Sequence, residues 1–183
     1  ISNTPEARRS NIESARLVLP PDGWRWQELS GRELTINDLE RLATLGADDP
    51  KFSWEREVQP LVYFRNLLDL RLAHYKSYGF GIHGLWFGEE FIGQFGLQVL
   101  DVERDRVEFA LFLGEKFTGR GIGSLLLSEL LLRCRKAGMT DLFGVVRPEN
   151  EGALALMRKF GGVESGKQEH FGKDATVFRF ALL

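Results

Sequence analysis

Three glycines at alternating positions are the first residues whose spacing points to chemistry. Gly119, Gly121 and Gly123 stand between an apolar, strand-like run and a leucine-rich, helical run. Glycines at such a junction let backbone N–H groups converge on an anion, and the amino end of a helix adds positive potential. Arg120, with Lys116 nearby, supplies counter-charge suited to phosphate groups. The alternative is a flexible turn that only starts the helix, and glycine spacing alone does not separate the two.

Two well-known phosphate-binding loops do not fit this segment. A Walker A loop needs Gly-Lys-Ser/Thr, and Ile122-Gly123-Ser124 lacks the lysine that reaches the outer phosphates. The dinucleotide fingerprint needs a glycine where Ser124 stands, and it belongs to a parallel strand–helix–strand unit with no antiparallel meander before it. The predicted anion is therefore neither a nucleoside triphosphate nor NAD bound by these loops.

The elements before the loop follow from hydrophobic periodicity and from turn residues. Residues 16–19 predict a first strand that ends at Pro20-Pro21, and residues 24–29 predict a weaker extended piece. Thr35 and Asp38 resemble a capping box for a helix that Gly46 stops. A second helix is predicted over about 60–75, and the residues expected on its buried face are Leu61, Phe64, Leu67, Leu68 and Leu72.

The second half of the chain predicts the sheet that carries the loop. Two strands, 80–87 and 91–100, are joined by a hairpin at Gly88-Glu89-Glu90 and followed by a charged turn over 101–105. The remaining elements expected are a strand at 107–113, a helix from 125 to near Gly138, a strand at 142–146, a helix at 151–160 and a closing hairpin at 162–183. This order predicts an α/β (α+β) fold with a mixed, mainly antiparallel central sheet flanked by helices.

Composition limits the class of protein. The 183 residues suit one domain, with 43% hydrophobic and 27% charged residues, and we expect it to span residues 13–183 behind a flexible tail of residues 1–12. A net charge of −2 gives no reason to expect nucleic acid or an anionic membrane as a partner. The single cysteine, Cys134, excludes an internal disulfide and argues against a cysteine-based zinc site. No apolar stretch resembles a membrane span or a signal peptide, so a cytoplasmic location is the default.

The glycine segment resembles the pyrophosphate loop of the GNAT superfamily of acyltransferases. That loop has the form Gln/Arg-x-x-Gly-x-Gly/Ala, and the segment 118–123 matches it at both required glycines, Gly121 and Gly123. It departs at Thr118, where Gln or Arg is usual. The departure weakens one side-chain contact and leaves the backbone cradle in place.

A second signature of the family lies further along the chain. Its form is Asn-x-x-Ala-x-x-Leu-Tyr-x-Lys-x-Gly-Phe, with Met157 here in place of Tyr and Gly162 in place of Phe. Residues 15–17, 78–80 and Glu108 look like the RimJ/RimL-type branch. Two motifs in the right order identify the chain as a member of the family. The residues that match the second signature are Asn150, Ala153, Leu156, Lys159 and Gly161.

The resemblance implies an activity and a set of binding residues. The activity is transfer of an acetyl group from acetyl-CoA to a primary amine, either a protein N-terminus or a small-molecule amine, by direct attack and with no metal. The pyrophosphate would lie on Thr118, Gly119, Arg120, Gly121, Ile122, Gly123 and Ser124. The pantetheine arm would run beside Leu111, Phe112 and Leu113, whose backbone N–H groups would polarise the thioester carbonyl, and would meet Asn150. Asn150 also fits the plain role of capping the helix that follows it.

Glu108 is the first candidate for the base that such a transfer needs. An amine with a pKa of about 8 to 10.4 is mostly protonated at neutral pH, so a proton acceptor helps. Family members place a carboxylate at this strand position, and strand alternation puts Glu108 on one face with Ala110 and Phe112. The alternative is a solvated carboxylate paired with a neighbouring arginine. His83 on a nearby strand is a second candidate, although a lone histidine in an apolar strand is more often structural.

The general acid is missing from the pattern. The signature tyrosine that protonates the leaving thiolate in many family members is replaced by Met157, and no tyrosine follows Tyr78 that a later strand or helix would offer instead. Met157 then packs in the core or lines the cofactor's apolar part, and water protonates the thiolate. A non-catalytic acyl-CoA sensor is the rival in another class.

The acceptor and the assembly stay open. A polyamine, an antibiotic amine or an amino acid competes with a protein N-terminus as acceptor, and a monomer competes with a homodimer. The acidic residues at 89–90 and 101–105 are solvated turns or attract a cationic amine.

Overall fold

A computed structural model describes residues 7–47, 49–170 and 172–183 of the chain. Within these residues a single mixed sheet forms, with eight strands in the order β1-β2-β3-β4-β5-β6-β8-β7. The strands are β1 (Trp24–Trp26), β2 (Leu29–Arg32), β3 (Ile82–Phe87), β4 (Glu90–Asp101), β5 (Arg106–Leu113), β6 (Asp141–Val146), β7 (Val163–His170) and β8 (Lys173–Ala181).

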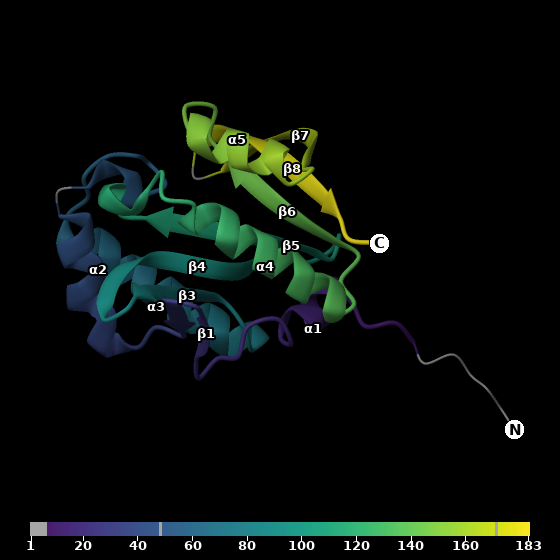
Figure 1. The fold of residues 1–183 in the computed structure, drawn as a ribbon, viewed down its shortest axis with the longest axis horizontal. Coiled ribbons are helices and arrows are strands. Elements are labelled where there is room, and N and C mark those ends of the chain that lie inside the picture. Colours follow the sequence, from purple (N-terminus) through teal and green to yellow (C-terminus); the bar gives the residue numbers. More distant parts are fainter. Residues whose placement is uncertain (1–6, 48, 171) are drawn as a thin grey trace, which may run out of the picture.

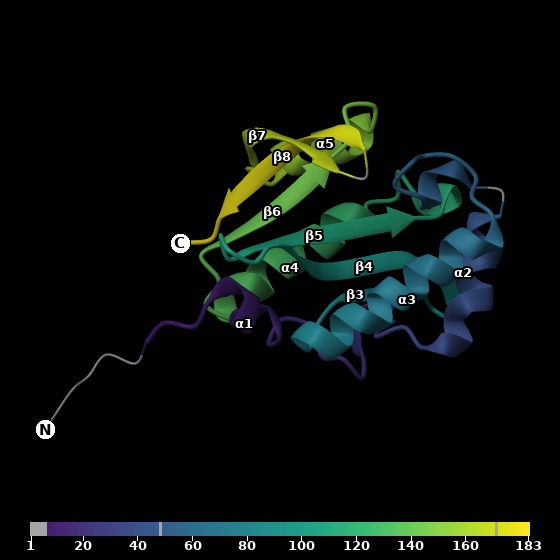
Figure 2. The same ribbon diagram turned by 180° about the vertical axis from the view of Figure 1, so that it is seen from behind.

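Helices cover both faces of this sheet. Helices α4 and α5 lie over one face, and α2 and α3 lie over the other (Figures 1 and 2). None of the helices in the described part of the chain is long and apolar enough to cross a membrane. The helices are α1 (Asn11–Ala15), α2 (Leu39–Gly46), α3 (Leu61–Tyr78), α4 (Ile122–Lys136) and α5 (Glu151–Lys159), with 3-10 turns at Ile36–Asp38, Pro50–Phe52 and Glu115–Phe117.

Strands β5 and β6 are the point where the sheet opens. They are parallel, and their ladder consists of the pairs Glu108↔Phe143 and Phe109↔Gly144. Beyond Phe109, β5 continues to pair with β4 up to Leu113, while β6 pairs with β8 on its other side. The two strands therefore diverge, as Figure 1 shows, and the backbone edge of β5 that faces β6 is left without a strand partner in the described chain.

Two hydrophobic clusters hold the layers together. The larger one joins the sheet to α4 through Leu126 and Leu130, and the smaller one joins it to α2 and α3 through Leu42, Phe64 and Leu68. Burying a side chain of this size is worth about 1.5–3 kcal/mol. Cys134 lies in the larger cluster, and burial raises the pKa of its thiol to about 12, as expected for an inert core residue.

Most of the predicted elements are present, including the meander β3–β5, helices α2 to α5 and the closing β7–β8 hairpin. The predicted mixed, mainly antiparallel sheet flanked by helices is confirmed. The capping box at Thr35 and Asp38 is present. The predicted extended piece over 24–29 is divided into β1 and β2, which pair with each other as a hairpin.

The predicted first strand at residues 16–19 is wrong. These residues form turns after α1, because Ser10 and Glu13 make a complete capping box that starts a short helix at Asn11. The tail was also expected to run to residue 12. Asn11 is instead buried, and its Nδ2 donates hydrogen bonds to Thr140 Oγ1 at 3.0 Å and to Asp141 Oδ1 at 2.8 Å. Residues 1–6 lie outside the described chain.

Helix α3 buries most of the predicted face, since Phe64 and Leu68 are core residues and Leu67 and Leu72 pack against them, but Leu61 does not belong to it. It begins after Pro60 and ends at Gly79, which has a φ of 74°. Leu61 was expected in the core and is 53% exposed, whereas Arg71 and Tyr75 are buried together with Phe64 and Leu68. The buried stripe is thus partly polar, because it faces a cavity as well as the sheet.

Candidate active site

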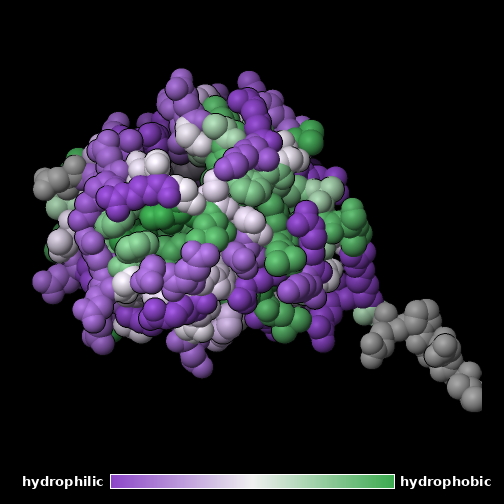
Figure 3. All heavy atoms as spheres, viewed as in Figure 1, coloured by the Kyte–Doolittle hydropathy of each residue, from purple (hydrophilic) through white to green (hydrophobic). Residues whose placement is uncertain are grey.

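A cavity of about 1130 Å³ lies where β5 and β6 diverge. It reaches from the glycine loop at the start of α4, past the ends of both strands, to the inner face of α3. Figure 3 shows a hollowed, mainly hydrophobic region on the α4 side, bordered by hydrophilic side chains. The predicted site residues that line the cavity are Glu108, Leu111, Phe112, Leu113, Thr118, Gly119, Gly121, Gly123, Ser124 and Asn150.

The backbone of the glycine loop is open to a ligand. Gly119 and Gly121 have φ values of 72° and 81°, in the left-handed region that favours glycine. A Cβ at either position would meet no atom within 4 Å, so both face open space. Gly121 is the N-cap of α4 and makes no side-chain cap, and the first turn contains no acidic residue. The free N–H groups and the helix dipole therefore fit an anion such as a pyrophosphate.

The side chains of the loop are less involved than the sequence suggested. Ile122 is buried in the core. Arg120 is exposed, and its guanidinium lies 5.6 Å from the centre of the Phe117 ring. Lys116 forms an ion pair with Glu90 at 2.5 Å. These three predicted contributors do not line the cavity.

A different cation reaches the loop. Lys159 Nζ donates a hydrogen bond to Ser124 Oγ at 2.9 Å, at the amino end of α4. Lys159 belongs to the second signature in the sequence, although spacing alone gave it no role. Thr118 lines the cavity wall, but its hydroxyl donates to the backbone oxygen of Glu115 at 2.7 Å.

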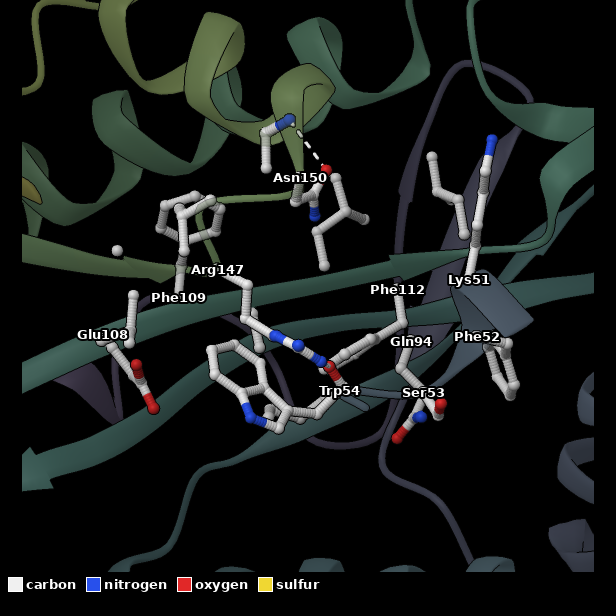
Figure 4. A pocket seen from close by; sticks show the side chains of 18 of the residues that line it. Lys51, Phe52, Ser53, Trp54, Gln94, Glu108, Phe109, Phe112, Arg147 and Asn150 are labelled. Carbon is white, nitrogen blue, oxygen red and sulfur yellow. Dashed lines mark hydrogen bonds between the residues drawn. The ribbon is translucent and has the colours of Figure 1, made fainter. Parts of the chain in front are cut away.

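The diverging strand and helix α5 form the next part of the wall. Leu111 pairs with Phe95 and shares the α4 face, whereas Phe112 pairs with Gln94 on the α3 face. Asn150 is the N-cap of α5, and its Oδ1 accepts from the Ala153 N–H at 3.2 Å (Figure 4). Because Asn150 also lines the cavity, its capping role and a ligand contact are compatible.

Met157 occupies the place of the signature tyrosine. Its side chain is 2% exposed and lines the cavity wall, as the sequence suggested. Its sulfur would lie 2.8 Å from a Cβ built on Gly144, so it packs tightly against β6. No tyrosine follows Tyr78 in the sequence, yet the earlier Tyr63, on α3, lines the cavity. Burial and the nearby Glu55 carboxylate raise the pKa of Tyr63, which keeps the phenol protonated at neutral pH.

Glu108 is the buried carboxylate of the cavity. It is 4% exposed, and its Oε1 accepts from Gln98 Nε2 at 2.6 Å. Burial raises the pKa of Glu108 to about 7, while the Gln98 hydrogen bond and the charge of Arg71 act in the opposite direction. A carboxyl group with a pKa of about 7 accepts protons efficiently near neutral pH.

The alternative of a solvated, ion-paired Glu108 does not hold. Arg104 contacts Asp101 instead, with its Nε 3.8 Å from Oδ2. Arg106 lies over the Phe143 ring, with its guanidinium 4.7 Å from the centroid. Both arginines therefore have other partners.

His83, the second predicted base, lies on the opposite face of the sheet. It pairs with Phe95, so alternation directs its side chain to the α4 face, whereas Glu108 lies on the α3 face with Gln98. His83 is 1% exposed, and its Nδ1 accepts from Trp24 Nε1 at 3.1 Å. Burial lowers the pKa of His83 to about 4. It is a structural histidine outside the cavity wall.

Several polar residues of the wall were missed by the sequence reasoning. Arg71 Nε donates to Gln94 Oε1 at 3.0 Å, and Arg71 Nη1 lies 3.4 Å from Gln98 Oε1. His74 also lines the wall, but its Nδ1 donates to the Phe80 oxygen and its Nε2 accepts from the Val99 N–H, so neither nitrogen is free. The sequence does carry one signal for this part of the wall. Gln94 and Gln98 are four positions apart in a predicted strand, which places both on one face of the sheet.

The segment between α2 and α3 closes one side of the cavity. Trp54 Nε1 donates to the His170 backbone oxygen at 3.2 Å, and the two rings pack edge to face. Arg147 Nη1 donates to the Trp54 backbone oxygen at 3.1 Å. Figure 4 shows Arg147 extending across the cavity toward Trp54. The segment is thus tied to β6 and to the β7–β8 hairpin.

Comparison with known proteins agrees with this geometry. The acetyltransferase (GNAT) domain family matches residues 29–163, which is more than half of the chain. The chain belongs to the GNAT acetyltransferase family, as its motifs predicted.

Solved structures with low sequence identity share the fold. The microcin C7 self-immunity acetyltransferase MccE, in complex with acetyl-CoA and AMP, is 15% identical with a TM-score of 0.74, covering 90% of this chain and 98% of that one. A putative ribosomal-protein-serine acetyltransferase from Vibrio cholerae is 18% identical with a TM-score of 0.73, covering 89% and 99%. RimL, a ribosomal L7/L12 alpha-N-protein acetyltransferase in complex with coenzyme A, is 16% identical with a TM-score of 0.70, covering 89% and 97%.

Proposed function

We propose that this protein transfers an acetyl group from acetyl-CoA to a primary amine. The observation that carries the proposal is the position of Glu108. A buried carboxylate with a pKa of about 7 lies in the same cavity as an uncapped glycine loop at a helix amino end. One end of this cavity suits an anionic cosubstrate, and the other supplies a base.

Acetyl-CoA would occupy the α4 side of the cavity. Its pyrophosphate would lie on the backbone of Gly119, Gly121 and Gly123, with Ser124 and Lys159 beside it. Its pantetheine arm would follow the open edge of β5 at residues 111–113 and reach Asn150. Support comes from the wall these residues form and from the MccE and RimL structures of the same fold, which contain acetyl-CoA and coenzyme A.

The acceptor amine would approach from the α3 side. Glu108 accepts a proton from the ammonium group or from the attacking nitrogen, and the nitrogen lone pair forms a bond to the thioester carbon. Backbone N–H groups on the free edge of β5 stabilise the negative charge on the carbonyl oxygen. The carbon–sulfur bond breaks, and the thiolate takes a proton from water. The products are an amide and free coenzyme A, with no covalent enzyme intermediate.

A non-catalytic acyl-CoA sensor is the second candidate. The observation that favours it is Met157, which is 2% exposed and stands where many family members have the acid tyrosine. A sensor needs the glycine loop but neither a base nor an acid. A sensor forms no product, so the ionisation of Glu108 would have no reaction to affect.

Two measurements test the proposal. The first is a thermal scan with acetyl-CoA at 100 times its Kd, where binding to the native state alone should raise stability by about 2.7 kcal/mol. The second is thiol release from acetyl-CoA with a panel of protein N-terminal peptides and small amines. Turnover with any amine removes the sensor candidate. Stabilisation without turnover by any amine supports the sensor, and no stabilisation contradicts both.

A further inference from the structure

Three residues of the cavity wall carry buried polar atoms without a hydrogen-bond partner. In the described chain, five buried side-chain nitrogen or oxygen atoms have no hydrogen-bond partner, and three of these belong to cavity-lining residues. An unsatisfied buried polar group costs about 1–3 kcal/mol, so native proteins keep few of them. The three atoms are Glu55 Oε2, Gln94 Nε2 and Arg147 Nε. Their concentration in one cavity points to a ligand that pairs with them.

Gln94 provides a hydrogen-bond donor with a fixed orientation, on the part of the cavity wall that β4 forms. It is 1% exposed and lies on the α3 face of β4, opposite Phe112 in the ladder. Its Oε1 accepts from Arg71 Nε at 3.0 Å, which determines the orientation of the amide. Nε2 is then left as an N–H donor without an acceptor in the described residues.

Arg147 provides a second donor, from the end of β6. It is 8% exposed, and two of its nitrogens are held, Nη1 by the Trp54 oxygen at 3.1 Å and Nη2 by Glu149 Oε1 at 2.5 Å. These contacts fix the plane of the guanidinium and leave Nε–H unpaired. A guanidinium held in this way is suited to a carboxylate oxygen, because charge-assisted hydrogen bonds are the strong ones.

Glu55 provides a hydrogen-bond acceptor, in contrast to the donors of Gln94 and Arg147. Its Oε2 is a buried acceptor without a donor in the described residues, and its carboxylate lies near the Tyr63 phenol. Together with Glu108 it gives the α3 side of the cavity two carboxyl groups. An ammonium group fits that environment because it brings both charge and N–H donors.

We propose that the acceptor is a free amino acid or a close analogue, in which one molecule carries both the primary amine and a carboxylate. The amine meets the carboxyl group of Glu108, on the side of the cavity to which Glu55 adds a second carboxyl group, and the carboxylate meets the donors of Gln94 and Arg147. A polyamine offers these donors no acceptor, and the backbone of a protein N-terminus offers them only neutral carbonyl oxygens. This inference rests on the proposed acetyl transfer, and it names the class of substrate.

The test compares amines that differ only in the carboxylate. Suitable pairs are L-valine with isobutylamine, L-phenylalanine with phenethylamine and L-lysine with cadaverine, and L-valinamide represents a neutral carbonyl. We expect kcat/KM to be ~10- to 100-fold higher for the carboxylate member of at least one pair, the range expected when hydrogen bonds to a charged group are lost. Equal or better turnover of the amines that lack the carboxylate, or of the amide, overturns the inference.

Variants show whether the two donors cause this preference. Arg147→Met and Gln94→Leu should each reduce activity on the amino acid ~10-fold or more beyond any loss on its decarboxylated partner. Arg135→Met on the exposed side of α4 is the matched control and should leave the ratio unchanged. A thermal scan of each variant monitors folding. Variants that fold and keep the wild-type ratio contradict the assignment of these donors.

A binding measurement separates this inference from the proposed function. Calorimetric titration of the coenzyme A-loaded protein with L-valine and with isobutylamine needs no turnover. If no amine is acetylated but the amino acid binds more tightly, acetyl transfer fails and the acceptor site stands. If amines are acetylated without any preference for the carboxylate, acetyl transfer stands and the acceptor site fails.

Discussion

Gln98 Nε2 donates a hydrogen bond to Glu108 Oε1 at 2.6 Å, across the ladder between β4 and β5. The Oε1 of the same amide lies 3.4 Å from Arg71 Nη1, so Gln98 connects the buried guanidinium to the carboxylate. A hydrogen bond to the charged form of a carboxyl group favours ionisation. Gln98 therefore opposes the effect of burial and holds the pKa of Glu108 near neutrality.

Replacing Gln98 should move the pH dependence of the reaction. Gln98→Leu removes a donor to the charged form of Glu108, so the pKa of Glu108 should rise above about 7. A hydrogen bond to a charged group is worth about 1.5–3 kcal/mol, which corresponds to a shift of about 1–2 pH units. The measurement is the acid limb of kcat/KM against pH. If the acid limb lies at the same pH in the variant and in the wild type, Gln98 does not control the ionisation of Glu108.

The buried carboxyl group should also make stability depend on pH. The pKa of Glu108 is raised from an ordinary value of 4.5 to about 7, so the folded protein binds this proton more tightly than the unfolded chain. Its contribution to stability is present below pH 4.5 and is lost as the pH rises to about 7. Glu108→Gln should therefore gain stability relative to the wild type between pH 4.5 and 8, by on the order of 3 kcal/mol. Urea unfolding at both pH values measures the change, and a constant difference would contradict the raised pKa.

Much of the fold could be predicted because local patterns determined it. The alternation in β3 to β5, the leucine stripe of α4 and the capping box at Thr35 each depend on neighbouring residues. The glycine loop was found in the same way, because Gly119 and Gly121 need the left-handed backbone that only glycine adopts readily. The predicted strand over 16–19 is wrong, because the capping box of Ser10 and Glu13 starts a short helix directly before it.

The acceptor side of the cavity could not be predicted, because its residues meet only through tertiary structure. Arg71 on α3 and Gln94 on β4 are 23 residues apart in the sequence. Arg147 and Trp54, which are also in contact, are 93 residues apart. Neither pair leaves a local pattern. The sequence predicts Glu108 as the first and His83 as the second candidate base on nearby strands, and only the ladder register shows that they lie on opposite faces of the sheet.

The glycine loop gives a direct test of cosubstrate binding. Gly121→Val should abolish coenzyme A binding, because a side chain would occupy the open space above the backbone and a φ of 81° is strained for valine. Gly138→Val is the matched control, since Gly138 has a φ of 87° at the other end of α4 and a Cβ there also meets no atom within 4 Å. Each variant should lose about 1–3 kcal/mol of stability through strain. Calorimetric titration that finds equal affinity in the two variants would mean that the loop is only a turn.

Asn150 has two roles that substitution can separate. Asn150→Ala removes both the cap of α5 and the amide, and should cost about 1 kcal/mol of stability and raise the KM for acetyl-CoA. Asn150→Ser keeps a capping oxygen, so the stability should return while the KM stays high. Urea unfolding and steady-state kinetics measure the two effects. A serine variant with a normal KM would leave capping as the only role of Asn150.

Glu108→Gln should lower turnover at neutral pH far more than it weakens acetyl-CoA binding. The substitution keeps the size of the side chain but removes the proton acceptor, and a general base typically contributes ~10²- to 10⁴-fold. We expect a loss near the lower end, because water in the cavity can take the proton less efficiently. The deficit should shrink as the pH rises toward the pKa of the substrate amine, since the free amine then forms without a base. Because Glu108 ionises with a pKa of about 7, the wild type should lose activity below neutral pH along a limb that the variant lacks. A deficit of equal size at every pH would instead assign Glu108 to positioning the amine, and a wild-type rate at neutral pH would exclude it from the reaction.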